Sequence, residues 1–211
     1  MATYFCITFE YSKSGLTNHT VSDFYNNLIN NGLSFKGGYW GSEKNTLEEI
    51  ISWNQQKLND DFQLGYTEHY THDYKQVLFN FYGFSVARLF ILNYKKYDHF
   101  SFELIIPEDD FLHVKRGRKR KVIRLYDRME YVKSLIEKMW DTDTFNYINT
   151  TWESTSGYSP VNDLKNNKEP IIQPYAVIPT ELFRDTLKCQ SQIIGNNGIM
   201  LINENNWYYF E

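Results

Sequence analysis

Three successive runs of alternating apolar residues between Phe62 and Ile106 are the feature that most constrains the fold of this chain. Apolar side chains recur with a period of two at residues 77, 79 and 81, at 86, 90 and 92, and at 100, 102, 104 and 106, and turn-like breaks separate the runs at Gly83 and at residues 95–98. A period of two is typical of β-strands. Because the connections between the runs are short, the pattern predicts an antiparallel meander.

Further strands are predicted near both ends of the sequence. Residues 2–11 place Phe5, Ile7, Phe9 and Tyr11 on one side, with Thr8 and Glu10 on the other, which indicates a half-buried strand. Near the other end, the pattern predicts strands at 175–178, 198–202 and 207–210, with a short helix at 180–187.

Helical periodicity marks three other segments. A first helix is expected from Thr20 to Asn31, and a second begins at a capping box formed by Thr46 and Glu49. A third is indicated by apolar residues spaced three and four apart from Val122 to Met139. Residues 33–45 are interpreted as a loop with at most one short strand, and 153–170 as a long loop.

These elements together favour an α+β fold, with helices layered on a largely antiparallel sheet. The chain is long enough for one domain or for two closely packed subdomains. If there are two, we expect an N-terminal α+β subdomain at 1–114 and a C-terminal helix with a small sheet at 122–211. Residues 115–121 then form a basic connection between them.

That connection, KRGRKRK, holds six of the 22 Lys and Arg residues. The rest of the chain has 16 Lys and Arg against 26 Asp and Glu, so the run carries +6 and the remainder −10. The run is interpreted as a solvated connection, and the alternatives are binding to an acidic protein or to nucleic acid phosphates. The cations concerned are Lys115, Arg116, Arg118, Lys119, Arg120 and Lys121.

No arrangement of residues in the sequence predicts catalysis. His69 and His72 have metal-ligand spacing, but on a strand they would point to opposite faces. Cys6 and Cys189 lie in contexts typical of buried, inert thiols. The sequence contains no phosphate-binding glycine motif and no nucleophile elbow. We therefore expect a protein that is not an enzyme, with no catalytic residues, metal or cofactor.

The apolar stretches and the cysteine content indicate where the protein works. The opening residues MATYFCITFE lack a basic n-region and are interpreted as a strand, and no apolar run is long enough to span a membrane. Two cysteines without a CxxC pair favour reduced thiols. A cytoplasmic protein without membrane contact is the prediction.

The order of these segments also resembles a known class of proteins. An opening strand TYFCITFEY, a helix ending in NNGL, a helix with LEEIISWN, and the stretch HDYKQVLFNFYGFSVARLFILNY before FELIIPEDDF resemble the small cytoplasmic immunity proteins of bacterial polymorphic-toxin systems. The resemblance covers residues 3–112 and is one of overall pattern. It implies a protein that binds and neutralises a cognate toxin made by the same cell.

If that implication holds, the partner surface is expected among five residues. Tyr39 and Trp40 form a glycine-flanked aromatic pair that can anchor an interface. Asp60, Asp61 and Glu68 can supply charge complementary to a basic toxin. A loop and a polar helix end without function are the simpler alternative, and the sequence does not indicate an oligomeric state.

Overall fold

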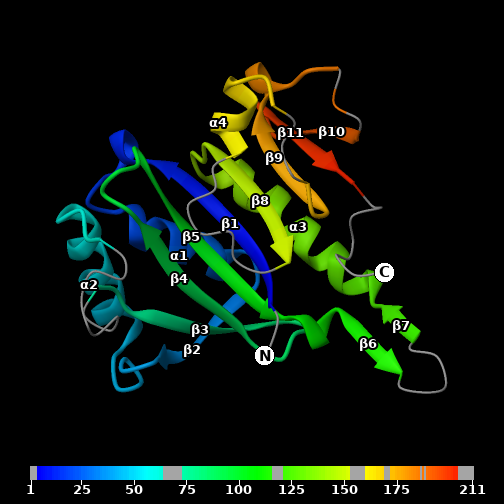
Figure 1. The fold of residues 1–211 in the computed structure, drawn as a ribbon. Helices are drawn as coiled ribbons and strands as arrows, with labels where there is room; N and C mark the ends of the chain where they lie inside the picture. Colours follow the sequence, from blue (N-terminus) through cyan, green and yellow to red (C-terminus); the bar gives the residue numbers. More distant parts are fainter. Residues whose placement is uncertain are drawn as a thin grey trace.

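The computed structural model describes residues 4–63, 73–115, 121–152, 160–168, 172–185, 187 and 189–203. Its main element is a nine-stranded sheet in the order β10-β11-β9-β8-β1-β5-β4-β3-β2, in which each adjacent pair is antiparallel (Figure 1). This arrangement confirms the α+β fold and its antiparallel sheet. The strands are β1 (Tyr4–Ser12), β2 (Leu33–Tyr39), β3 (Gln76–Phe81), β4 (Ala87–Asn93), β5 (His99–Pro107), β8 (Tyr147–Trp152), β9 (Tyr175–Pro179), β10 (Gln190–Ile194) and β11 (Gly198–Ile202).

The first strand of the chain lies in the middle of this sheet. β1 pairs with β5 along its whole length, from Tyr4 opposite Pro107 to Ser12 opposite His99, and its other edge pairs with β8. The sheet therefore contains strands from both sides of the basic run. Whether 1–114 and 122–211 fold as separate units stays a prediction.

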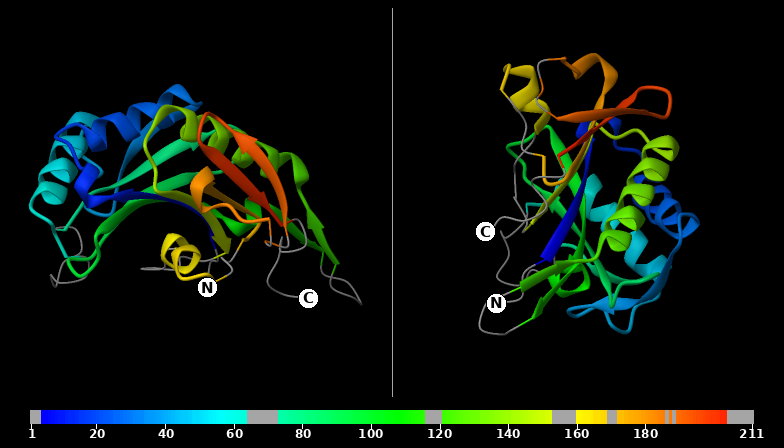
Figure 2. Two further views of the ribbon diagram at one scale, coloured as in Figure 1. Left: turned by 90° about the horizontal axis from the view of Figure 1, so that it is seen from above. Right: turned by 90° about the vertical axis from the view of Figure 1, so that its right-hand side faces the viewer.

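Three helices cover one face of the sheet: α1 (Thr20–Asn30), α2 (Leu47–Asn59) and α3 (Tyr126–Thr142) (Figure 2). Aromatic rings fill the layer between them. Phe24 of α1 stacks on Phe102 of β5 with ring centroids 4.1 Å apart, and Phe9 of β1 meets Phe24 edge-on. Buried rings of this kind supply much of the apolar area that stabilises a core.

A second, smaller core lies on the opposite face, where α4 (Pro160–Lys165) packs on the C-terminal strands (Figure 2). Val161 and Leu164 of this helix cluster with Ala176, Ile178 and Leu201. Both faces of the sheet are thus covered at its C-terminal half. This explains why β11 is buried at all five of its positions.

Several predicted elements are confirmed. The meander appears as β3, β4 and β5, the first helix begins at Thr20, and the predicted strands at 175–178 and 198–202 are β9 and β11. The capping box is formed as expected, since the Thr46 side chain accepts from the backbone of Glu49 and the Glu49 side chain accepts from the backbone of Thr46. The predicted strand at 207–210 lies outside the described residues.

Other expectations are wrong in detail. Residues 33–39 form a full strand, and β8 and β10 were not predicted at all. Residues 160–165 of the expected long loop are helical, and the helix expected at 180–187 is a single 3-10 turn, Thr180–Leu182. Glu10 is only 4% exposed, so β1 is buried on both faces where a half-buried strand was expected.

The basic run is also organised differently from the expectation. It does not lead directly into a helix, because its flanks form a two-stranded hairpin, β6 (Leu112–Lys115) and β7 (Lys121–Arg124), with Lys115 opposite Lys121. The helix α3 begins only at Tyr126, and Val122, the first residue of the expected helical stripe, belongs to β7. Residues 116–120 lie outside the described residues.

Truncation of Phe102 to Ala tests the aromatic core. Phe102 is fully buried, and its ring packs against Phe24 and Tyr25 of α1. We expect a loss of about 3–5 kcal/mol in the free energy of unfolding, measured by denaturant titration. The matched control is Tyr82→Ala at a ring that is 76% exposed, which should change stability by less than about 1 kcal/mol. A loss below about 1 kcal/mol for Phe102→Ala would contradict the packing described above.

Candidate interaction surface

Two exposed aromatic residues stand at the end of β2. Tyr39 is 37% exposed and Trp40 is 55% exposed, as the sequence had suggested for this pair. Trp40 has a φ of 51°, in the left-handed region that few residues other than glycine adopt, and Gly41 follows with a φ of 87°. Strained backbone of this kind persists only where surrounding contacts hold it.

Ser42 supplies those contacts. Its hydroxyl accepts from the backbone N–H of Tyr39 at 3.0 Å and lies 2.7 Å from the Tyr39 carbonyl and 3.1 Å from the Gln76 carbonyl, to which it can donate. In the same turn, the backbone N–H of Gly41 donates to both carboxylate oxygens of Glu43. The turn is therefore fixed by side chains of its own loop, and it presents Trp40 in a defined position.

The ring of Tyr39 is held from the sheet side. The Arg88 guanidinium carbon lies 5.1 Å from the centroid of Tyr39 and 5.3 Å from that of Tyr4. An arginine within about 6 Å of a ring face is attracted by the negative potential of the ring. Tyr39 is thus a partly exposed ring on a rigid support, a property shared by residues that anchor interfaces.

A third exposed aromatic residue lies on the helix that follows. Trp53 of α2 is 36% exposed, and it lines a hollow of about 470 Å³ together with side chains of α2, Asn45 and Lys75. The amino groups of Lys57 and Lys75 lie 5.1 Å and 4.9 Å from the Trp53 ring centroid. Lys75 also donates to Asn45 at 2.7 Å, which joins the start of β3 to the loop before α2.

Carboxylates surround these rings. Hydrogen bonds from backbone N–H groups of Glu43 itself and of Gly41 lower the pKa of Glu43. The side-chain amide of Asn45, followed by the backbone N–H of Thr46, lowers the pKa of Glu49. Both groups are therefore ionised at neutral pH and held in fixed positions.

We call this region the β2–α2 surface, because the loop that joins β2 to α2 brings its members to one end of the helix layer. It contains Tyr39, Trp40, Glu43, Asn45, Glu48, Glu49, Trp53 and Lys75. Trp53 and the ordered carboxylates were not predicted. The sequence did contain a signal that Trp53 is exposed, because this tryptophan lies outside the apolar stripe of α2.

The predicted acidic residues do not all join this surface. Asp60 and Asp61 follow the last residue of α2, so the helix, 13 residues or about 20 Å long, separates them from the loop that begins it. Asp60 is exposed, and Glu68 lies outside the described residues. The assignment of these three carboxylates to a partner interface stays a prediction.

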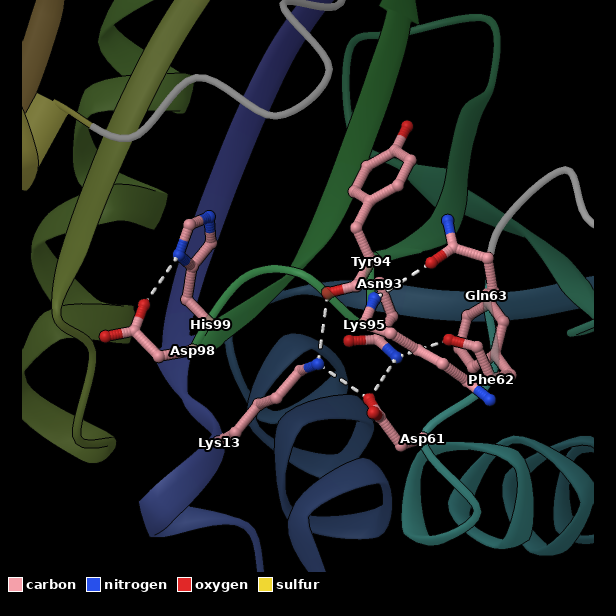
Figure 3. Close-up of polar contacts among 9 residues, drawn as sticks. All are labelled: Lys13, Asp61, Phe62, Gln63, Asn93, Tyr94, Lys95, Asp98 and His99. Carbon is pink, nitrogen blue, oxygen red and sulfur yellow. Dashed lines mark hydrogen bonds and ion pairs between the residues drawn. The ribbon is translucent and has the colours of Figure 1, made fainter.

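Asp61 already has partners within the chain (Figure 3). Its Oδ1 accepts from Lys13 Nζ at 2.6 Å and from Asn93 Nδ2 at 3.0 Å, and Lys13 also donates to the Tyr94 carbonyl at 3.1 Å. Burial alone would raise the pKa of Asp61, but the hydrogen bonds from Asn93 and Lys13 outweigh it and lower the pKa. Asp61 thus links the end of β1, the end of α2 and the end of β4.

The remaining candidates from the sequence are a metal site at the histidines and reactive cysteines. Within the described residues, no group of three or more His, Cys, Asp and Glu side chains is placed to hold a metal ion, and no helix is long and apolar enough to cross a membrane. His69 and His72 lie outside the described residues. Cys6 is buried and Cys189 is partly buried, and neither forms a disulfide.

Comparison of the chain with protein-family models, with curated proteins and with solved structures finds no match in any of the three.

The Asp61→Asn variant tests the structural role of the Asp61 contacts. A carboxyl whose pKa is lowered by folding adds stability above its unfolded pKa, and this stability is lost as the pH falls through the folded pKa. We expect Asp61→Asn to lose about 1 kcal/mol at neutral pH, the upper end for a partly exposed pair, as measured by denaturant titration. The loss should shrink as the pH falls below about 4.

Asp60→Asn is the matched control for this variant. Asp60 is adjacent in sequence and exposed, and it follows the same helix. We expect the free energy of unfolding of the Asp60→Asn variant to stay unchanged or rise slightly, because a carboxylate at the C-terminal end of a helix is unfavourable. Equal losses in the two variants would show that Asp61 is not the link described here.

Proposed function

We propose that this chain is a binding protein that neutralises a cognate bacterial toxin by forming a complex with it. The resemblance of residues 3–112 to immunity proteins suggests the class of partner. The observation that carries the proposal is the β2–α2 surface, where Trp40 and Trp53 are exposed beside ordered carboxylates. Exposed tryptophan and tyrosine on a rigid support are the residues that contribute most to protein interfaces.

The charge of this surface supports a basic partner. Glu43, Glu48 and Glu49 are exposed, as is Lys44, whereas Lys57 and Lys75 are partly buried and lie over the Trp53 ring. Toxin domains that act on nucleic acid are commonly basic, and opposite charge on an inhibitor increases the association rate. A protein of this kind would act in the cytoplasm, which agrees with two cysteines that form no disulfide.

Co-purification from the native cell tests the proposed function. We expect a toxin encoded beside this gene to be recovered with the protein, and the association rate to fall with added salt. Trp40→Ala should weaken the complex at least about tenfold, because loss of an interface anchor costs about 2 kcal/mol or more. Titration calorimetry with the purified toxin domain measures this change.

Tyr82→Ala provides the matched control for Trp40→Ala. Tyr82 is more exposed than Trp40 and follows β3 at the strand end far from Tyr39, which pairs with Gln76 at the start of that strand. Its loss should leave toxin binding unchanged. The proposal is wrong if the protein elutes alone and a neighbouring toxin kills cells whether or not the protein is present.

Binding of nucleic acid is a second candidate, which the β6–β7 hairpin favours. The two strands project away from the main sheet as a ribbon (Figure 1), with Lys115 and Lys121 paired at its outer end and Arg124 nearer its base. Residues 116–120, which connect these lysines in the sequence, add four further cations. A two-stranded ribbon fits the major groove of duplex DNA, and clustered cations bind phosphates.

Replacing Lys115, Arg116, Arg118 and Lys119 with Ser separates the two candidates. If the hairpin binds nucleic acid, the wild-type protein should shift a short duplex at low salt and the variant should not. Thermal stability should stay nearly unchanged, because exposed charges contribute little to folding. Absence of any shift by the wild-type protein at about 50 mM salt would exclude this second function.

A further inference from the structure

The two edges of the nine-stranded sheet, β2 and β10, are protected to different degrees (Figure 1). An edge strand presents unpaired backbone N–H and C=O groups, which can pair with a strand of another molecule. Proteins commonly protect such edges with a bulge, a lysine, a proline or a covering loop. The presence or absence of these features shows which edge is available for pairing.

The β2 edge carries three of them. Its register with β3 shifts between Phe35 and Gly37, and Lys36 at the shift is exposed. At the end of the strand, the Ser42 hydroxyl contacts both the N–H and the C=O of Tyr39. A second molecule cannot continue a regular ladder along β2 without removing these contacts.

Within the described residues, β10 itself contains no bulge, lysine or proline. Its sequence, QSQII, contains no charged residue, glycine or proline, and its five residues pair with β11 without a shift. The first four positions are exposed, and Ile193 is 77% exposed. An exposed isoleucine on a regular, uncharged edge strand is a feature of strands that pair with other chains.

We propose that β10 pairs with β10 of a second copy of this chain, antiparallel about a two-fold axis at Gln192. A two-fold axis makes a strand antiparallel to its own copy, which continues the antiparallel pattern of the sheet. The register centred on Gln192 is the one that pairs all five residues. It places Gln192 opposite Gln192 of the copy, and Ser191 opposite Ile193.

The side chains of β10 are suited to this arrangement. A glutamine amide carries both donors and an acceptor, so two glutamines related by a two-fold axis can bond to each other. The strand itself carries no charge, and Gln192 Nε2 donates to Glu137 of α3 at 3.4 Å, so one Glu137 of each copy lies near the axis. The two copies of Ile193 lie on the same face as diagonal neighbours, where large side chains about 7–8 Å apart still make contact. A second copy therefore covers the exposed isoleucine using only groups that this chain provides.

The length of β10 limits the strength of this dimer. Five paired residues bury less than the roughly 1,200–2,000 Å² typical of stable interfaces. We therefore expect a reversible dimer that is absent at about 1 μM protein and populated at about 100 μM and above. Sedimentation equilibrium across this range measures it.

Charge substitutions at Gln192 give a specific test. In the Gln192→Lys variant, and separately in Gln192→Glu, the axis brings two like charges directly opposite each other, which disfavours pairing. Each variant should stay monomeric at about 100 μM, whereas an equimolar mixture should dimerise again because Lys then meets Glu. Ser34→Lys, at an exposed position on β2, is the control and should dimerise like the wild-type protein.

Every outcome of this experiment decides the proposal. Restored dimerisation in the mixture supports it. A monomeric wild-type protein at about 500 μM, a dimer that persists in both single variants, or a mixture that stays monomeric would overturn it. Gln192 Nε2 donates to Glu137 Oε1 at 3.4 Å, so thermal melting curves should show that both variants remain folded. Ile193→Asp, at a position that is 77% exposed, gives an independent loss of pairing if one of them is unstable.

Discussion

The pairing of β1 with β5 and β8 holds the two halves of the chain in one sheet. β5 belongs to the meander, β8 follows the basic hairpin and α3, and β1 lies between them in the sheet. The side-chain contact between Thr8 and Glu103 spans 95 positions of the sequence. Pairing over such a distance in sequence costs loop-closure entropy before it gains any stability, so a sheet built around β1 is expected to fold more slowly than one made of local hairpins.

The two faces of β1 differ in chemistry. Phe9 meets the helix layer, whereas Thr8 and Glu10 lie on the opposite face beside Glu103 and Asn149 of the neighbouring strands. Glu10 and Glu103 are only 4% and 1% exposed. These carboxyl groups are part of the formal negative charge outside the basic run, but they do not lie at the surface. A basic partner therefore meets less negative charge than the composition suggests.

Regular elements could be predicted from the sequence, whereas interrupted ones could not. The alternation of the meander and the capping box of α2 are local signals, and both are confirmed. In β8, YINTTW, apolar and polar residues do not alternate. Thr150 is buried there because its hydroxyl lies within hydrogen-bonding distance of the Gln173 and Tyr175 carbonyls, and these partners cannot be read from the sequence of the strand. In β2 a bulge interrupts the period, and in β6 and β7 the charges of the basic run conceal it.

The candidate surface shows the same limit. Asp60 and Asp61 are neighbouring residues of the same type, so the sequence does not distinguish them. In the structure, Asp61 binds Lys13 and Asn93, which lie 48 and 32 positions away, whereas Asp60 is exposed at the helix end. Such partners are set by the tertiary fold and leave no local pattern. Tyr39 and Trp40 could be identified as exposed because flanking glycines mark the turn that presents them.

The sheet order relates the two proposals of complex formation to each other. β10 lies at one edge of the nine strands, and the β2–α2 surface lies at the other. Pairing through β10 would join two sheets while leaving both copies of Trp40 and Trp53 uncovered at the far ends. The proposed self-association and the proposed toxin binding would therefore use separate surfaces and would not compete. A dimer would instead carry two toxin sites far apart, so that each copy binds its toxin independently and no cooperativity between the sites is required.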